Sequence, residues 1–176
     1  MKKKIVILGS TGFIGKNVID ILQKDKKNIE IKLLTSNKNL KELIKQIKIF
    51  NVKNVIIFDK EKFYLAKKTL KNKKINIYNN FDSISKILSN KKVDYIMNAI
   101  SGIEGLNPTL KIIKYTKKIA IANKEAIICG WSLITKELKR YKTKFIPIDS
   151  EHFSIWELIN NTKNINIEKV FITASG

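Results

Sequence analysis

The sequence predicts an α/β protein built on a doubly wound, mostly parallel β-sheet. Apolar runs of strand length alternate with segments of helical periodicity along all 176 residues. The strand-like runs are continuously apolar, as expected of strands that helices cover on both faces. The first run also leads directly into a turn with regularly spaced glycines, which is typical of such folds.

That turn spans residues 9–15, of sequence GSTGFIG, and follows a strand expected over residues 4–8. A helix through Val18 and Leu22 comes next. Glycines allow a tight turn and a close approach of the backbone to a ligand, while the N–H groups of a helix's first turn attract an anion. The unit predicts a Rossmann-like pyrophosphate site, in a GxxGxxG variant of the more common GxGxxG. The alternative is a tight connection without a ligand.

The rest of the chain continues the alternation. Further strands are expected over residues 29–35, 54–58, 75–78, 95–100, 118–122, 145–148 and 167–173. Helices are expected over residues 40–50, 61–70, 84–88, 107–115, 133–141 and 151–159. Asn107 is a candidate N-cap, with Pro108 at the first helical position. A change near Pro147 divides the chain into a nucleotide-binding domain, residues 1–147, and the beginning of a second α/β domain, residues 148–176.

A formal net charge of +20 is typical of proteins that bind nucleic acids. However, Arg140 is the only arginine, and arginine is the residue whose planar fork reads bases and phosphates. The lysines form scattered pairs, such as Lys26-Lys27 and Lys91-Lys92, near the ends of predicted elements. We therefore interpret them as solvated helix faces and expect no nucleic-acid partner.

Cys129 is the only cysteine, which excludes a disulfide framework within the chain and fits a reducing compartment. No apolar run approaches the roughly 20 residues of a membrane-spanning helix. The first strand is expected within a few residues of Met1, which leaves no room for a signal peptide. We expect a cytoplasmic protein with no membrane partner.

The end of the second strand, residues 35–39, has the sequence TSNKN. NAD-binding folds usually place a carboxylate here to accept hydrogen bonds from the ribose 2′-hydroxyl. Lys38, between Asn37 and Asn39, instead favours a 2′-phosphate, so NADPH is expected over NADH. The alternative is an ordinary polar turn in which Asn37 adopts the left-handed conformation.

Asp149 and Glu151 follow the strand expected over residues 145–148. Residues two apart on an extended segment point the same way, so both carboxylates can meet a cation at the carboxyl end of the sheet. Oxygen ligands suit Mg²⁺ or Mn²⁺. The alternative, equally supported by these residues, is that Asp149 or Ser150 caps the next helix. The lone His152 is more often structural than a ligand.

Two further strand ends carry polar residues. Lys124, within Asn123-Lys124-Glu125, is a candidate for holding a substrate oxygen or phosphate, and the alternative is a solvated turn. Ser175, near the end of the sequence, is a weaker candidate for binding phosphate.

With these residues in place, the whole chain resembles the N-terminal part of the 1-deoxy-D-xylulose 5-phosphate reductoisomerases. Five motifs in the order of that family carry the resemblance. They are GSTGFIG at 9–15, AISG at 99–102 with the GL at 105–106 and PTL at 108–110, ANKEA at 122–126, PIDSEH at 147–152 and TASG at 173–176.

The resemblance implies an enzyme that rearranges 1-deoxy-D-xylulose 5-phosphate and reduces the resulting aldehyde with NADPH. The product is 2-C-methyl-D-erythritol 4-phosphate, an isoprenoid precursor. A divalent metal would act as a Lewis acid on the substrate oxygens. The resemblance also suggests a homodimer of the full-length protein.

Residue roles carry over by position in the same way. The resemblance assigns NADPH binding to Thr11, Gly12, Phe13, Ile14, Asn37, Lys38, Asn39, Asn123 and Glu125. It assigns metal binding to Asp149 and Glu151, and substrate binding to Lys124, Ser150, Glu151 and Ser175. Lys124, Asp149 and Glu151 would form the catalytic set, and His152 would lie near the substrate.

Three departures from the family pattern stand out. Phe13 replaces a residue that is usually small, and Asn37 stands where glycine is common. The family's enzymes are also much longer, and their remaining part supplies a third carboxylate ligand and a flap over the substrate. We therefore expect this chain alone to bind NADPH at best and to turn over nothing. Another NADP-binding oxidoreductase and a non-catalytic nucleotide-binding module are the alternatives.

Overall fold

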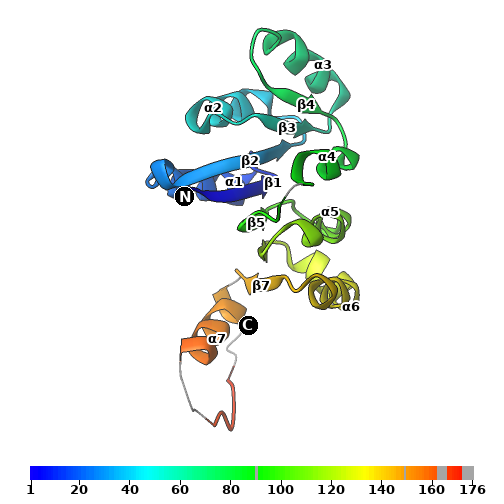
Figure 1. The fold of residues 1–176 in the computed structure, drawn as a ribbon. Helices are drawn as coiled ribbons and strands as arrows, with labels where there is room; N and C mark the ends of the chain where they lie inside the picture. The colour runs from blue at the N-terminus through cyan, green and yellow to red at the C-terminus, as the bar shows by residue number, and fades with distance from the viewer. Residues whose placement is uncertain (90, 149, 162–165, 172–176) are drawn as a thin grey trace.

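The computed structural model describes residues 1–89, 91–148, 150–161 and 166–171, with backbone only at residues 150, 151, 160 and 161. In this part of the chain a seven-stranded parallel sheet has the order β4-β3-β2-β1-β5-β6-β7 (Figure 1). The strands are β1 (Lys3–Leu8), β2 (Ile29–Ser36), β3 (Asn54–Ile57), β4 (Asn76–Tyr78), β5 (Tyr95–Asn98), β6 (Lys118–Ile121) and β7 (Lys144–Pro147).

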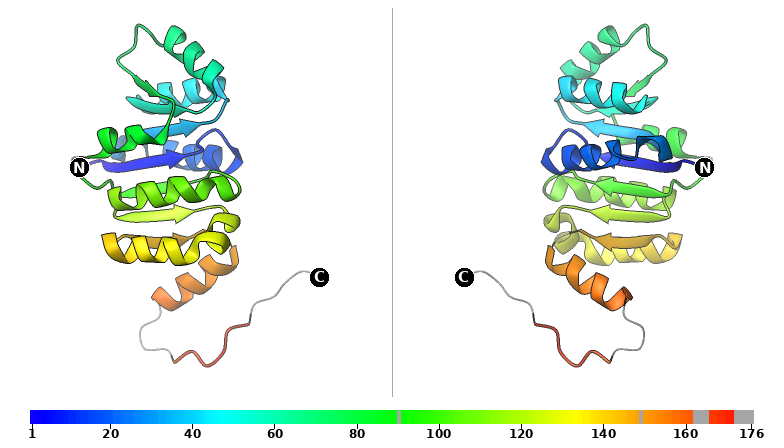
Figure 2. Two further views of the ribbon diagram at one scale, coloured as in Figure 1. Left: turned by 90° about the vertical axis from the view of Figure 1, so that its right-hand side faces the viewer. Right: turned by 90° about the vertical axis from the view of Figure 1, so that its left-hand side faces the viewer.

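Helices cover both faces of the sheet (Figure 2). One face carries α1 (Phe13–Gln23), α2 (Leu40–Phe50) and α3 (Lys60–Thr69), and the other carries α4 (Ile84–Leu88), α5 (Leu106–Ile112) and α6 (Lys124–Tyr141). Short 3₁₀ turns are η1 (Lys26–Asn28), η2 (Phe81–Ser83), η3 (Ile103–Gly105) and η4 (Ile113–Tyr115). After β7, α7 (Ser150–Asn161) extends beyond the edge of the sheet (Figure 1).

The continuous apolar runs are explained by two separate cores. In β1, Ile5 and Ile7 pack in the core beneath α1–α3, whereas Val6 and Leu8 pack in the core beneath α4–α6. Successive side chains of a strand point to opposite faces, so a strand buried on both faces needs an apolar residue at every position. The doubly wound α/β class predicted from the sequence is confirmed.

The order of the strands creates a crevice beside β1. From β1 the chain builds β2, β3 and β4 outward on one side, then crosses back to place β5 on the other side. The connections that follow β1 and β5 therefore leave in opposite directions at the carboxyl edge of the sheet. Open α/β sheets bind their ligands at this point.

One predicted helix is much longer than expected. The sequence placed it at residues 133–141, but α6 begins at Lys124, and the side chain of Asn123 caps it by accepting from the N–H of Ala126 at 3.0 Å. Gly130 lies inside this helix because a Cβ there would come within 2.2 Å of Leu106 Cδ1. The glycine serves close packing of α5 on α6, not a break between helices.

Two smaller expectations are wrong. Helix α5 begins at Leu106 with Gly105 at its N-cap, so Asn107 is not the cap and Pro108 is the third helical residue. Proline is tolerated there because the first N–H groups of a helix have no intrahelical partner. Residues 166–171 form no strand, and the remainder of the strand expected over 167–173 lies outside the described residues. The other elements begin and end within a few residues of their predicted limits.

Candidate functional site

Two glycines of the turn after β1 are required by the fold itself. Gly9 has φ +71°, and a Cβ there would lie 2.8 Å from the carbonyl oxygen of Ala99, the residue that follows β5. A Cβ at Gly15 would lie 2.3 Å from the carbonyl oxygen of Gly9. Both clashes involve backbone atoms, so a side chain at either position would force the turn or helix α1 to move.

Gly12 is different, because the protein has room for a Cβ at this position. The nearest atom, the carbonyl oxygen of Gly9, would be 3.4 Å away, which is ordinary van der Waals contact. Gly12 is exposed and forms the N-cap of α1, where no side chain accepts the first N–H groups. This geometry fits a diphosphate group, since it leaves both space and backbone donors for an anion.

The turn is hydrogen-bonded to the end of β2. The N–H of Gly9 donates to Thr35 Oγ1 at 2.8 Å, and the N–H of Ser10 donates to the carbonyl oxygen of Thr35 at 2.9 Å. The hydroxyl oxygens of Thr11 and Ser36 lie 2.8 Å apart. Thr35 and Ser36 are buried, so these bonds fix the turn relative to the second strand.

Gln46 supports the same turn from the buried face of the amphipathic helix α2, a role that the sequence analysis did not identify. Its side chain is fully buried, and Nε2 donates to the carbonyl oxygen of Ser10 at 2.9 Å. Among the described residues, its Oε1 is the one buried side-chain nitrogen or oxygen atom without a hydrogen-bond partner. A polar residue inside the helical pattern of residues 40–50 was the available signal.

Beyond β2, residues 37–39 are exposed at the carboxyl edge of the sheet. Asn39 caps α2, since its Oδ1 accepts from the N–H of Glu42 at 3.2 Å. The carbonyl oxygen of Asn37 accepts from the N–H of Asp59 at 3.2 Å. Asn37 is not among the residues with positive φ, so the left-handed turn considered for it is wrong. Lys38 stands between the two asparagines as an exposed cation.

A cavity of about 480 Å³ lies at the crevice beside β1. It is lined by Gly9, Thr11, Gly12, Thr35, Ser36, Asn37, Lys38, Asn39, Phe58, Phe81, Ala99, Ile100, Ser101, Glu104 and Pro108. Five of the residues predicted to bind the cofactor therefore surround one cavity. Phe13 and Ile14 do not line it, although they form the first turn of α1 and are 82% and 40% exposed.

Asn123 shapes the cavity indirectly. Its side chain is buried, and Nδ2 donates at 2.6 Å to the carbonyl oxygen of Ile100, a residue of the cavity wall. Asn98 holds the next part of that loop, since its Nδ2 donates to the carbonyl oxygen of Gly105 at 3.0 Å and to Thr109 Oγ1 at 2.7 Å. The loop after β5 is therefore fixed by two buried amides.

Residues 5–130 match the family model of 1-deoxy-D-xylulose 5-phosphate reductoisomerase, and residues 145–176 match the model of that enzyme's C-terminal domain. The chain belongs to the 1-deoxy-D-xylulose 5-phosphate reductoisomerase family. The resemblance carried by the five sequence motifs is thereby confirmed.

Reductoisomerases of several bacteria resemble the chain over nearly all of its length. The enzyme of Pelagibacter ubique is 62% identical over 175 residues, and that of Thermodesulfovibrio yellowstonii is 38% identical over 174 residues. Each match includes 99% of this chain, but the chain spans only 45% of the length of each relative.

Solved reductoisomerase structures agree with the fold. A structure of the Zymomonas mobilis enzyme in complex with NADPH matches 89% of this chain and 41% of its own, with 29% identity and a TM-score of 0.81. A reductoisomerase in complex with NADPH, fosmidomycin and magnesium matches 88% of this chain and 38% of its own, with 26% identity and a TM-score of 0.80.

Lys124, which the reductoisomerase motifs assign to substrate, does not line the cavity of the glycine turn. Lys124 and Glu125 are exposed in the first turn of α6. Lys124 lines a second, largely apolar cavity of about 510 Å³ with Ile127, Ile128, Trp131, Phe145, Pro147 and His152. A lysine at a helix N-terminus is electrostatically unfavourable unless an anion is near, which is consistent with a phosphate or oxyanion ligand.

The two residues that the reductoisomerase motifs assign to a metal, Asp149 and Glu151, lie outside the described side chains. Asp149 and Ser175 lie outside the described residues, and Ser150 and Glu151 are described only as backbone at the start of α7. In the described part of the chain no three His, Cys, Asp or Glu side chains gather as metal ligands would. Because every strand is parallel, α7 begins at the same edge of the sheet as the glycine turn.

Within the described ranges, every helix is too short or too polar to cross a lipid bilayer.

Proposed function

We propose that this chain is the NADPH-binding part, and the beginning of the catalytic domain, of an enzyme that converts 1-deoxy-D-xylulose 5-phosphate to 2-C-methyl-D-erythritol 4-phosphate. The product would enter isoprenoid synthesis, and the full-length protein would act as a homodimer. The observation that carries the proposal is the single cavity that joins the glycine turn to Lys38. Family membership and the structures of relatives with NADPH support it.

The cavity suits NADPH at both of its charged groups. Gly12 and the first turn of α1, with Thr11, Phe13 and Ile14, would hold the diphosphate. Lys38, flanked by Asn37 and Asn39, would hold the 2′-phosphate, because residues 35–39 include no carboxylate to bind a ribose hydroxyl instead. When bound, NADPH would supply the hydride for the reduction.

The substrate would bind beyond the ends of β6 and β7. Lys124 at the start of α6 would attract the phosphorylated sugar, while Ser150, Glu151 and Ser175 would complete its contacts. Asn123 would keep the loop after β5 in place at the nicotinamide end, and Glu125 would contact the cofactor there. Asp149 and Glu151 would hold Mg²⁺ or Mn²⁺, which would supply Lewis-acid stabilisation of substrate oxygens.

Two measurements on the 176-residue chain test the cofactor part of this proposal. Titration with NADPH and NADH should show saturable binding of both, with NADPH bound more tightly. With 1-deoxy-D-xylulose 5-phosphate and Mg²⁺ present, the absorbance of the reduced nicotinamide should not fall, since the chain spans 45% of its relatives. Failure to bind NADPH would overturn the cofactor site, and steady NADPH oxidation would overturn the inactivity of the chain alone.

The metal role requires the longer protein. In that protein, Asp149→Asn should abolish turnover while NADPH binding stays intact. Unchanged turnover would show that the reaction does not depend on Asp149. A longer protein that binds NADPH but shows no turnover even without the substitution would favour the alternative of a module that binds nucleotide without catalysis.

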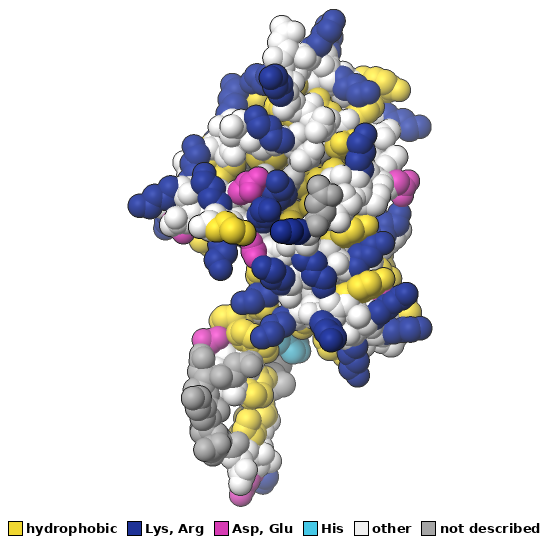
Figure 3. Space-filling view, in the orientation of Figure 1, with side chains coloured by type: hydrophobic (Ala, Val, Ile, Leu, Met, Phe, Trp, Pro, Cys, Tyr) yellow, Lys and Arg dark blue, Asp and Glu magenta, His cyan; other side chains and the backbone are white. Residues whose placement is uncertain are grey.

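A nucleic-acid partner is less well supported than a small molecule. The net charge is +20, but on the face drawn in Figure 3 the Lys and Arg side chains are scattered over the body that contains the sheet and do not form one stripe. Binding to nucleic acid requires clustered charge and weakens steeply with salt. Salt titration of any binding to duplex DNA would separate the two readings.

A further inference from the structure

The cavity that contains the glycine turn and Lys38 also has an aromatic wall. Phe58 and Phe81 both line it, and their ring centroids lie 4.8 Å apart with the planes inclined at 44°. Both residues are partly exposed. Burial in the core therefore accounts for only part of each side chain, and each ring keeps surface that faces the cavity.

Phe58 is held in register with the segment predicted to bind the 2′-phosphate. It directly follows β3, the strand next to β2, and its N–H donates to the carbonyl oxygen of Ser36 at 3.1 Å. Gly12, Lys38 and Phe58 thus follow three neighbouring strands, β1, β2 and β3. A ligand that extends from the glycine turn past Lys38 reaches the aromatic wall next.

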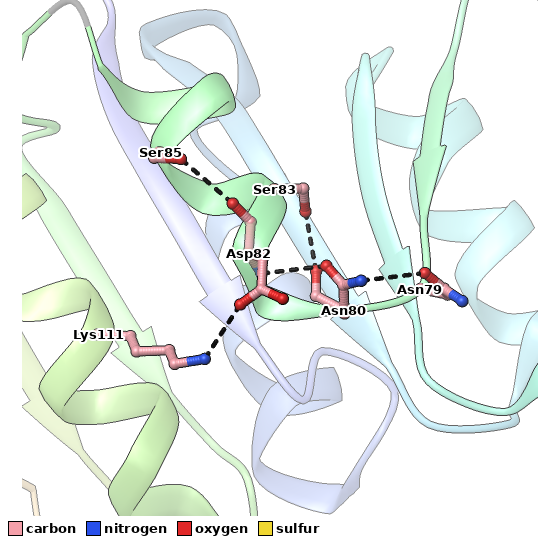
Figure 4. Close-up of polar contacts among 6 residues, drawn as sticks. All are labelled: Asn79, Asn80, Asp82, Ser83, Ser85 and Lys111. Carbon is pink, nitrogen blue, oxygen red and sulfur yellow. Dashed lines mark hydrogen bonds and ion pairs between the residues drawn. The ribbon is translucent and has the colours of Figure 1, made fainter.

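Phe81 begins η2, a turn that is fixed on both sides (Figure 4). Asn80 Oδ1 accepts from the N–H of Asp82 at 3.1 Å, and Ser83 Oγ donates to the carbonyl oxygen of Asn80 at 2.8 Å. Asp82 also forms an ion pair with Lys111 of α5 at 3.2 Å. The turn is therefore held against the helix that supplies Pro108 to the same cavity.

We propose that Phe58 and Phe81 bind the adenine base of NADPH by stacking. This inference rests on the proposed NADPH function and assigns the adenosine end of the cofactor to two residues that no motif identified. An adenine presents a flat π-face that aromatic side chains bind, and it is the group one ribose away from a 2′-phosphate at Lys38. The two rings offer no charge, so this end of the cavity is unsuited to a further phosphate.

Leucine substitutions separate stacking from simple burial. Phe58→Leu and Phe81→Leu keep an apolar side chain against the core but remove the π-face. Tyr64→Leu is the matched control, since Tyr64 lies on α3 and is 68% exposed, away from the cavity. Each phenylalanine variant should weaken NADPH and 2′,5′-ADP roughly tenfold. The control should bind both ligands as the unaltered chain does.

Two further readouts test the assignment. The nucleotide ratio separates a lost adenine contact from a lost 2′-phosphate contact, and a tryptophan variant separates stacking from unfolding. Because adenine is common to both nucleotides, the phenylalanine variants should weaken NADH by the same factor and leave the NADPH/NADH ratio unchanged. Phe81→Trp keeps an aromatic face, so this variant should bind 2′,5′-ADP as tightly as the unaltered chain does. Its indole fluorescence should be quenched by 2′,5′-ADP more than that of the unaltered chain. Unchanged affinity in both leucine variants would overturn the inference while leaving NADPH binding intact. An unaltered chain that binds neither NADPH nor 2′,5′-ADP would overturn the proposed function as well.

Discussion

The Nε2 atom of Gln46 lies 2.9 Å from the carbonyl oxygen of Ser10 and so joins helix α2 to the glycine turn. The same nitrogen donates to Glu42 Oε1 at 3.2 Å, while Oε1 of Gln46 has no partner among the described residues. A buried amide with one unsatisfied oxygen costs free energy, so its presence is best explained by the support it gives to the turn.

Replacing Gln46 by leucine should therefore damage the turn more than the core. Gln46→Leu keeps the volume but leaves the carbonyl oxygen of Ser10 buried without this donor, a loss of about 1–3 kcal/mol. We expect a lower free energy of unfolding in urea and several-fold weaker NADPH binding by calorimetry. Gln23→Leu, at the exposed end of α1, is the control and should change neither. Equal NADPH affinity in Gln46→Leu and the control would contradict this role.

The glycine turn predicts opposite phenotypes for two alanine substitutions. In Gly15→Ala the new Cβ would lie 2.3 Å from the carbonyl oxygen of Gly9, so the protein should be strongly destabilised. In Gly12→Ala the nearest atom would be 3.4 Å away, so stability should be nearly unchanged. The methyl group would nevertheless stand where a diphosphate approaches the backbone N–H groups at the start of α1. NADPH affinity should therefore fall by about tenfold or more. Thermal unfolding and nucleotide titration of both variants test this contrast.

Lys38 should determine which nicotinamide nucleotide the chain prefers. Lys38→Gln removes the cation proposed to face the 2′-phosphate, and bonds to charged groups are worth about 1.5–3 kcal/mol. We expect NADPH to bind about 10- to 100-fold more weakly and NADH to be little affected. Lys41→Gln is the matched control, because Lys41 is an exposed lysine in the first turn of α2 but does not line the cavity. Loss of both nucleotides in equal measure would argue against a 2′-phosphate contact.

The sequence predicted most of the fold because its signals are local. Continuous apolar runs such as residues 5–8 and the glycine spacing of residues 9–15 reflect the strand and the turn directly. The start of α6 was missed because Gly130 interrupts the helical pattern for a tertiary reason, contact with Leu106. Helix propensity carries no information about such a contact.

The site was predicted less completely than the fold. Lys38 and Gly12 carry motif signals, and the structure places them around one cavity. Gln46 and the Phe58–Phe81 pair belong to no motif, because residues far apart in the chain meet only through the order of the strands. Whether Asp149 and Glu151 hold a metal stays a prediction.

Asn123 is expected to be needed for structure as well as for the cofactor. Asn123→Asp keeps an oxygen for the N–H of Ala126 but replaces the donor 2.6 Å from the carbonyl oxygen of Ile100 by a second oxygen. The repulsion between these oxygens should lower the thermal midpoint by several degrees, since about 1–3 kcal/mol is lost. Asn72→Asp, at an exposed position after α3, serves as a control for the added charge. An unchanged midpoint for Asn123→Asp would show that the loop after β5 does not depend on this bond.

Asp94 should make the stability of the fold depend on acid pH. The ammonium of Lys117 lies 2.8 Å from Asp94 Oδ1, and the backbone N–H of Lys4 donates to Oδ2 at 2.9 Å. These two bonds, chiefly that of Lys117, lower the pKa of Asp94 below the ordinary value for aspartate. The carboxylate therefore stabilises the fold fully above that ordinary pKa, and the contribution is lost as pH falls through the lower pKa of the folded state.

Asp94→Asn tests this directly, because it removes the charge and keeps the shape. Its thermal midpoint should be lower than that of the unaltered chain at neutral pH by about 2–4 °C, which corresponds to about 1 kcal/mol. The difference should shrink as pH falls below the ordinary aspartate range and vanish once Asp94 is protonated in the folded protein. Asp20→Asn, on the exposed side of α1, controls for the change in net charge. A difference between Asp94→Asn and the unaltered chain that stays constant from neutral to acid pH would mean that packing, and not the carboxylate charge, stabilises this end of β5.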